Sequence, residues 1–236
     1  MKNRYHILIL GVLLSAAPGM KAQTFKTDIS ADIVSRYIWR GSSMGEVSVQ
    51  PTLGISAWGL SLSAWGSVGI SNPQDAKELD LTLAYNIGGF NIGITDYWVE
   101  GGADPDNLYF RYAKGATNHV FEANVGYDFG PVAVQWYTNF AGNDAVGANG
   151  KPAFSSYAEV SVPFKLGGTE WSFVTGIVPY ATKFYDVDRF ALVNVSLTAS
   201  VDIPFSERFS LPIFATLAAN PHARQVFFVV GITLQP

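Results

Sequence analysis

The chain has 236 residues, of which 48% are hydrophobic, 14% aromatic and only 14% charged, and its net charge at pH 7 is −4. Soluble domains carry about 25% charged residues, so this composition indicates that much of the exterior does not face water. The negative net charge offers no basic surface for nucleic acid. The chain has no cysteine, which excludes a disulfide framework.

The first 22 residues have the features of a cleaved secretory signal. Lys2 and Arg4 precede an apolar run at 7–14, and small residues then lead to Ala22, after which we expect cleavage. The run is too short for a membrane-spanning helix, which needs about 20 residues. We therefore predict a signal peptide at 1–22 and a single mature domain at 23–236.

The mature region is built from segments in which every second residue is apolar, the pattern of a strand with one apolar and one polar face. Residues 78–87 read Glu-Leu-Asp-Leu-Thr-Leu-Ala-Tyr-Asn-Ile. No apolar run after residue 22 could form a spanning helix, so any membrane passage would be made by strands. Twelve strands are predicted, at about 26–40, 49–58, 60–69, 78–87, 90–98, 117–129, 132–140, 155–164, 171–180, 190–203, 209–218 and 225–234.

The connections alternate between short turns, such as Gly88-Gly89, and longer polar segments, such as 101–107 and 141–151. Outer-membrane barrels combine short periplasmic turns with longer extracellular loops and an even strand number. We therefore predict an all-β fold, a transmembrane antiparallel up-and-down β-barrel of about 12 strands. It would lie in the outer membrane of a Gram-negative bacterium, with both termini periplasmic.

A soluble lipocalin-like barrel or β-sandwich is the alternative fold, and in it the apolar faces would point inward. Two features count against this alternative. The faces that we assign outward are almost free of charge, whereas a soluble barrel needs a charged exterior. The opposite faces carry too many ionisable groups for a dry core. This distribution favours the membrane barrel.

Strand parity assigns the polar faces to the lumen. A twelve-stranded barrel has a backbone radius of about 12 Å, so side chains would leave a narrow passage. The predicted pore-lining residues are Asp32, Arg36, Arg40, Glu78, Asp80, Glu122, Glu159, Tyr97, Tyr137 and Tyr157.

Two interpretations of these charges stay open. In the first, the two arginines face a partly acidic wall and orient small polar solutes that diffuse passively through the channel. In the second, the charges pair and plug the barrel, which then acts as a structural or adhesive scaffold whose loops carry a surface role.

Aromatic residues are expected in two girdles at the depth of the lipid headgroups, where they would contact membrane lipid and lipopolysaccharide. The girdle residues are Trp39, Trp98, Trp136 and Phe140 near the long loops, and Phe129, Phe164 and Trp171 near the short turns.

An enzyme is the remaining function class, because outer-membrane phospholipases also use twelve strands. They need a serine beside an activating histidine at the lipid face. The mature chain has two histidines: His119 is expected to point outward near a strand start, and His222 lies in a loop. No metal-ligand spacing appears. We predict no enzymatic activity, no cofactor and no metal, although a serine from another strand could still approach His119.

The segment Ser35-Arg36-Tyr37-Ile38-Trp39-Arg40-Gly41 resembles an element, Ser-x-Tyr-x-aromatic-Arg-Gly, of the TorF-type porins, a family of small Gram-negative outer-membrane barrels. Residues 49–53 and 78–81 add to the similarity. The resemblance implies an outer-membrane barrel with an unknown small polar solute and no catalytic residues, and it makes Arg36 and Arg40 the best pointer to a shared feature of the lumen. Such a location further implies periplasmic chaperones and the barrel-assembly machinery as partners.

Overall fold

The computed structural model describes residues 25–72, 75, 77–100, 107–113, 115–147, 150–206 and 209–236. No helix in this part of the chain is long and apolar enough to cross a membrane. The strands are β1 (Lys26–Val34), β2 (Tyr37–Trp39), β3 (Ser42–Gly45), β4 (Ser48–Ala57), β5 (Leu60–Gly69), β6 (Lys77–Ile87), β7 (Phe90–Glu100), β8 (Val120–Asp128), β9 (Ala133–Gly142), β10 (Ser156–Leu166), β11 (Thr169–Val178), β12 (Ala191–Ser206), β13 (Phe209–Asn220) and β14 (Gln225–Leu234).

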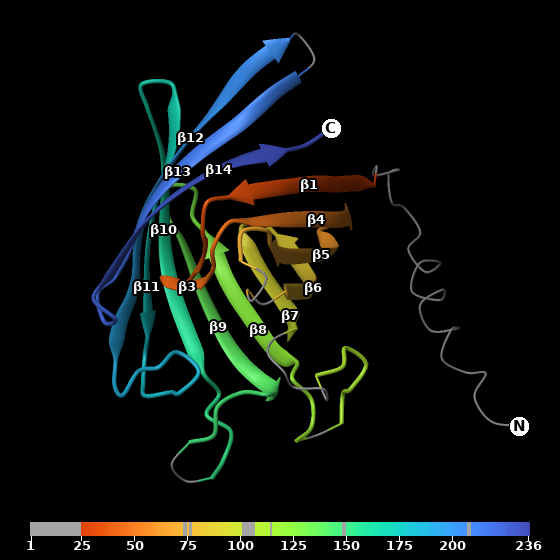
Figure 1. The fold of residues 1–236 in the computed structure, drawn as a ribbon, viewed down its shortest axis with the longest axis vertical. Coiled ribbons are helices and arrows are strands. Elements are labelled where there is room, and N and C mark those ends of the chain that lie inside the picture. Colours follow the sequence, from red (N-terminus) through yellow and green to blue (C-terminus); the bar gives the residue numbers. More distant parts are fainter. Residues whose placement is uncertain are drawn as a thin grey trace, which may run out of the picture.

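Twelve of these strands close into one antiparallel barrel, in the order β1-β14-β13-β12-β11-β10-β9-β8-β7-β6-β5-β4 (Figure 1). The predicted fold class is confirmed. The barrel closes where β1 meets β14, and this seam contains four residue pairs, from Ala31 to Val34 on β1. By contrast, β1 shares nine pairs with β4.

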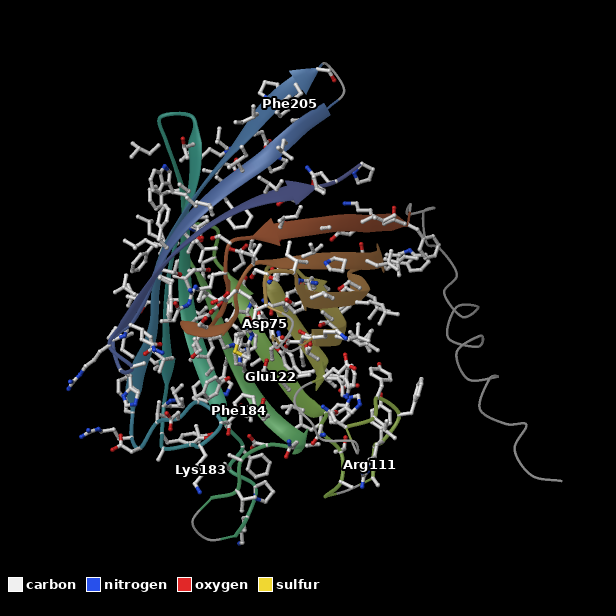
Figure 2. All side chains as sticks on the ribbon, viewed as in Figure 1. Asp75, Arg111, Glu122, Lys183, Phe184 and Phe205 are labelled. Carbon is white, nitrogen blue, oxygen red and sulfur yellow. The ribbon has the colours of Figure 1, made fainter. Side chains whose placement is uncertain are left out.

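The outer wall of the barrel is apolar and the inner wall is polar. Leu62, Leu83 and Ile94 point outward and keep about half of their side-chain surface exposed, whereas Asp80 and Glu122 are buried inside. Figure 2 shows Glu122 within the ring of strands. A soluble barrel has the reverse distribution, since exposed apolar strands would aggregate in water. This distribution belongs to a transmembrane barrel, whose outer band contacts hydrocarbon.

The two ends of the barrel differ in their connections. At one end, strands are joined by two-residue turns such as Gly88-Gly89 and Gly167-Gly168, whose φ angles are all positive. Positive φ at both central residues defines the type I′ turn that matches strand twist. β1 begins and β14 ends here, and we call this the short-turn end. The opposite, long-loop end carries the described residues 70–72, 107–113, 115–119, 143–147, 150–155 and 179–190.

The first predicted strand, 26–40, is wrong in its second half. β1 leaves the barrel wall after Val34, where the Ser35 N–H donates to the Val230 carbonyl at 2.9 Å and the Ser35 hydroxyl accepts from the Val230 N–H at 3.0 Å. The chain then forms a separate two-stranded sheet, β2 with β3. Its turn is Arg40-Gly41, with φ angles of 47° and 80°. We call residues 37–45 the lumen hairpin.

Candidate functional site: the lumen hairpin and its anchor

The lumen hairpin crosses the interior of the barrel. It starts from β1 and β4, and its tip reaches strands on the other side of the closed sheet, β8, β9, β10 and β12. At the tip, Gly41 packs so closely on β12 that a Cβ atom there would lie 2.0 Å from the Val193 carbonyl oxygen. Only glycine, which has no Cβ, permits this approach.

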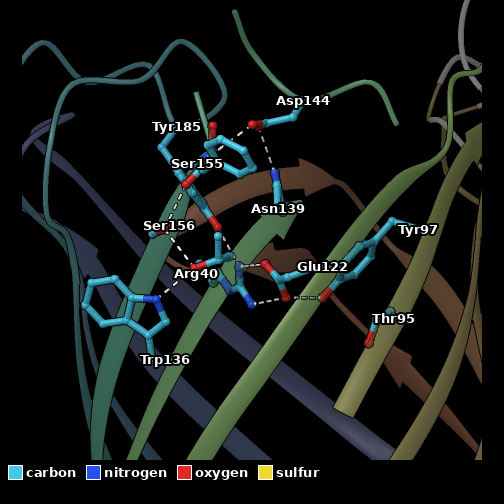
Figure 3. Close-up of polar contacts among 12 residues, drawn as sticks. Arg40, Thr95, Tyr97, Glu122, Trp136, Asn139, Asp144, Ser155, Ser156 and Tyr185 are labelled. Carbon is cyan, nitrogen blue, oxygen red and sulfur yellow. Dashed lines mark hydrogen bonds and ion pairs between the residues drawn. The ribbon is translucent and has the colours of Figure 1, made fainter. Parts of the chain in front are cut away.

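Arg40, at the hairpin tip, forms a buried ion pair with Glu122 of β8 (Figure 3). Its Nη1 and Nη2 atoms lie 2.6 and 2.8 Å from the two carboxylate oxygens. The two side chains are 8% and 2% exposed. The Tyr97 hydroxyl donates a further hydrogen bond to Glu122 at 2.9 Å, and Arg40 also donates to the hydroxyl of Tyr185. Such two-pronged pairing of guanidinium and carboxylate is both strong and geometrically specific.

Aromatic rings surround the same guanidinium. The Arg40 Cζ atom lies 4.5, 4.1 and 4.6 Å from the ring centroids of Trp39, Tyr137 and Tyr157. Each ring presents its negative face to the cation, an arrangement that gains strength when water is excluded. Trp39 in turn stacks on Tyr185 with centroids 5.9 Å apart. The anchor cluster, which we define as Arg40, Glu122, Tyr97, Tyr185 and the three rings, fixes the tip on the opposite wall.

The electrostatics of the cluster keep the arginine charged. Burial opposes the charge of Arg40, but Tyr185 and Glu122 outweigh it and hold its pKa well above the ordinary value. Burial raises the pKa of the Tyr185 hydroxyl above its usual range, although Arg40 opposes this. The charged guanidinium therefore donates both to the phenol of Tyr185 and to the carboxylate of Glu122.

The acidic wall opposite the arginines is only partly assembled as predicted. Glu122 meets Arg40, whereas Glu78 and Asp80 on β6 form no ion pair with either arginine among the described residues. Tyr37 of the hairpin lies over this wall, and its ring centroid is 5.4 Å from that of Trp65. Burial and the two carboxyl groups raise the pKa of Tyr37. Glu159 pairs in register with Gln135 and lies near Tyr137 and Tyr157.

Arg36 and Asp32 stay apart from the anchor cluster. Arg36 Nη1 lies 3.5 Å from the Ser43 hydroxyl oxygen, and its Cζ atom lies 5.9 Å from the centroid of Phe227. Asp32 accepts a hydrogen bond of 2.6 Å from the Thr233 hydroxyl. No ion pair joins either of them to another charged side chain in the described ranges.

The lumen hairpin separates two cavities of similar size. One, of about 330 Å³, lies between the hairpin and the wall formed by β1, β4, β5, β12, β13 and β14, and Asp32, Arg36 and Gln50 are among its lining residues. The other, of about 310 Å³, lies toward the long-loop end, where Trp39, Tyr97 and Tyr185 line it. Residues of the hairpin thus line both cavities.

Two of the predicted girdle residues depart from the expected positions: one lies in the lumen, and the other lies on the outer wall but away from the long-loop end. Phe129, Phe140 and Phe164 are exposed there, and Trp171 stacks on Phe164 with centroids 6.1 Å apart. Trp39 is the first exception: it lies in the lumen, because its strand turns inward after Val34.

Trp136 is the second exception. It is 42% exposed on the outer wall but lies in the middle of β9 and not at its long-loop end. Trp98 also faces outward but is covered, and its indole N–H donates to Asn107 at 3.0 Å.

His119 is buried, contrary to the expectation of an exposed surface histidine. It is 0% exposed, and its Nδ1 atom lies 2.7 Å from Asp96 Oδ1. Its Nε2 atom lies 2.6 Å from the carbonyl oxygen of Tyr109, which can only accept, so Nε2 carries the proton. The Tyr112 ring packs on the imidazole with centroids 4.3 Å apart. His119 therefore ties the segment 107–113 to the barrel wall, and neither ring nitrogen contacts a serine among the described residues.

We expect the His119→Phe variant to loosen the segment 107–113 without opening the barrel. Phenylalanine retains the ring contacts but loses both hydrogen bonds, each worth about 1.5–3 kcal/mol when a charged group takes part. Amide hydrogen exchange in 107–113, followed by mass spectrometry, should accelerate by about tenfold or more. His222→Phe is the matched control, because His222 is exposed and its ring lies 3.3 Å from the Asp186 carbonyl oxygen, a longer contact than either of those of the His119 ring. Equal exchange in both variants would contradict this role.

Sequence reasoning missed Tyr185 and its neighbour Phe184, which reach the hairpin from the segment 179–190. Phe184 packs edge-on against Trp39, with centroids 6.2 Å apart. The segment is held by the Thr182 hydroxyl, 2.5 Å from that of Ser155. Two adjacent aromatic residues in a polar loop were the only signal of an inward contact.

Comparison with known proteins gives a distant likeness to two solved structures. No family model matches the sequence, and no curated protein matches it. A porin refined at 1.8 Å resolution is 15% identical and aligns over 80% of this chain with a TM-score of 0.34; the chain spans 62% of its length. The COG4313 outer membrane channel from Pseudomonas putida F1 is 14% identical, with a TM-score of 0.39, over 92% of this chain and 97% of that one.

Proposed function

We propose that the protein is an outer-membrane channel through which small polar solutes diffuse passively, with the short-turn end and both termini in the periplasm. The observation that carries the proposal is a polar lumen with cavities on both sides of a hairpin that belongs to no barrel strand. Because β2 and β3 pair with each other and with no other strand that the structure describes, the hairpin can shift without breaking the hydrogen-bond ladder of the barrel. A passage can therefore widen without loss of the fold.

A plugged scaffold is the second candidate, and the anchor cluster is the observation that favours it. A bidentate ion pair between two nearly buried side chains, with two tyrosine contacts, holds the hairpin in the closed position. If this anchor never releases, the barrel is sealed and its function lies in the outer loops.

Unitary conductance in planar lipid bilayers tests the two candidates. We expect discrete, stable openings from folded protein, with a small conductance set by the hairpin. Folded protein that inserts but stays silent under all voltages would contradict the channel and favour the scaffold. Liposome-swelling rates over sugars, amino acids and nucleosides would then rank the permeating solutes.

A further inference from the structure

The cavity beside β1 carries two opposite charges that form no ion pair with any residue that the structure describes. Three of its lining residues are acids or bases that are charged near neutral pH, namely Asp32, Arg36 and Arg40. The charge of Arg40 is balanced by Glu122, as described above. Arg36 and Asp32 remain, and no ion pair joins them to each other or to another described residue. The cavity therefore presents one available cation and one available anion.

The remaining lining of this cavity is suited to a small amphipathic molecule. Gln50, Asn194, Ser196 and Thr216 offer neutral hydrogen-bonding groups, and Trp65 and Phe214 offer ring surface. A volume of about 330 Å³ lies at the low end of the range for small-ligand sites, about 300–1,000 Å³. Polar groups at fixed points with apolar surface between them are the usual composition of such sites.

We propose that this cavity binds zwitterionic amino acids, with the α-carboxylate on Arg36 and the α-ammonium on Asp32. A guanidinium matches a carboxylate through two parallel hydrogen bonds. The Asp32 Oδ1 atom is held by Thr233, which orients the carboxylate and leaves Oδ2 to accept from an ammonium group. The aromatic surface then receives an apolar side chain. The inference rests on the proposed channel function, since it names the solute class that the lumen receives.

Three probes of nearly equal size separate the two charge contacts. L-phenylalanine has both charged groups, 3-phenylpropionate lacks the ammonium and 2-phenylethylamine lacks the carboxylate. In titration calorimetry with folded protein in detergent micelles, we expect L-phenylalanine to bind about tenfold more tightly than either analogue, the usual effect of one charged hydrogen bond.

Two conservative variants assign each contact to its residue. Asp32→Asn should reduce L-phenylalanine binding to the level of 3-phenylpropionate and leave 3-phenylpropionate unchanged, because the amide oxygen can still accept from Thr233. Arg36→Gln should reduce L-phenylalanine binding to the level of 2-phenylethylamine. The double variant, which carries both Asp32→Asn and Arg36→Gln, serves as the background control, because any heat it still shows reports partition of the probe into the micelle. Circular dichroism checks that each variant is folded.

Equal affinities for the three probes in the unmodified protein would overturn the proposal, and so would variants that weaken all three alike. Failure of the channel function is distinguishable. A protein that conducts ions but does not discriminate the probes lacks only the amino-acid site, whereas one that binds L-phenylalanine but never conducts lacks only the channel.

Discussion

Replacing Arg40 by alanine should raise the unitary conductance in planar bilayers several-fold. The variant removes the ion pair with Glu122, the contact to Tyr185 and the stacking on three rings. Removing one partner of a buried ion pair costs about 3–5 kcal/mol of stability. This loss should destabilise the docked hairpin and not the barrel, because β2 and β3 form a sheet separate from the barrel strands. The tip is thereby released from the opposite wall, and the lumen widens.

Two further variants and a control sharpen this test. Arg40→Lys keeps the charge but cannot form the two-pronged contact, so we expect an intermediate conductance. Glu122→Gln removes the balancing charge and should act in the same direction as Arg40→Ala. The control is Lys165→Gln, which breaks an ion pair of 2.6 Å whose side chains are 78% and 65% exposed. Exposed pairs contribute little. Identical conductance in Arg40→Ala and the unmodified protein would show that the hairpin does not limit passage.

Gly41→Ala should release the hairpin by a different route, through steric exclusion at its tip. The new Cβ would lie 2.0 Å from the Val193 carbonyl oxygen, a distance that requires the backbone of the tip to move. We expect higher conductance together with faster proteolysis within 37–45, because the displaced tip leaves its anchor. The barrel should retain its circular dichroism spectrum.

Gly168→Ala is the matched control for this variant. Gly168 is the second residue of a two-residue turn, as Gly41 is, and their φ angles are 79° and 80°. Both substitutions therefore introduce the same left-handed strain, about 1–2 kcal/mol, but no atom lies within 4 Å of the Cβ position at Gly168. Any difference between the two variants reports the contact with β12 alone. Equal conductance would show that the tip does not dock there.

The alternation of apolar and polar residues was enough to predict the barrel, because lipid and lumen impose opposite demands on the two faces of every strand. Asp80 and Glu122 were assigned to the inner face for that reason, and both are buried in the structure. The same pattern could not separate the lumen hairpin from β1. Tyr37 and Trp39 alternate with polar or smaller residues, as they would in one continuous strand and as they do in the separate strand β2. Length does not separate them either, because β12 runs over 16 residues and stays in the barrel wall.

The partners within the lumen were beyond reach of the sequence. Arg40 and Glu122 are 82 positions apart, and they meet only because the closed order of strands sets β8 across from the start of the hairpin. His119 was assigned to the outer face by parity, but its burial depends on how the segment 107–113 folds back. Parity predicts which wall a side chain belongs to, not which loop covers it.

The seam between β1 and β14 has a mechanical consequence. Four residue pairs hold β1 to β14, whereas nine hold it to β4. The seam is therefore the weakest strand-to-strand contact that β1 makes in the barrel wall. Within the described part of the chain, the backbone of Lys26–Ser30 has no β14 partner. When force is applied to the two termini of the chain, β1 and β14 should separate first, beginning at Ala31 and proceeding toward Val34. The ring then opens into a curved sheet before any other pair of neighbouring strands separates.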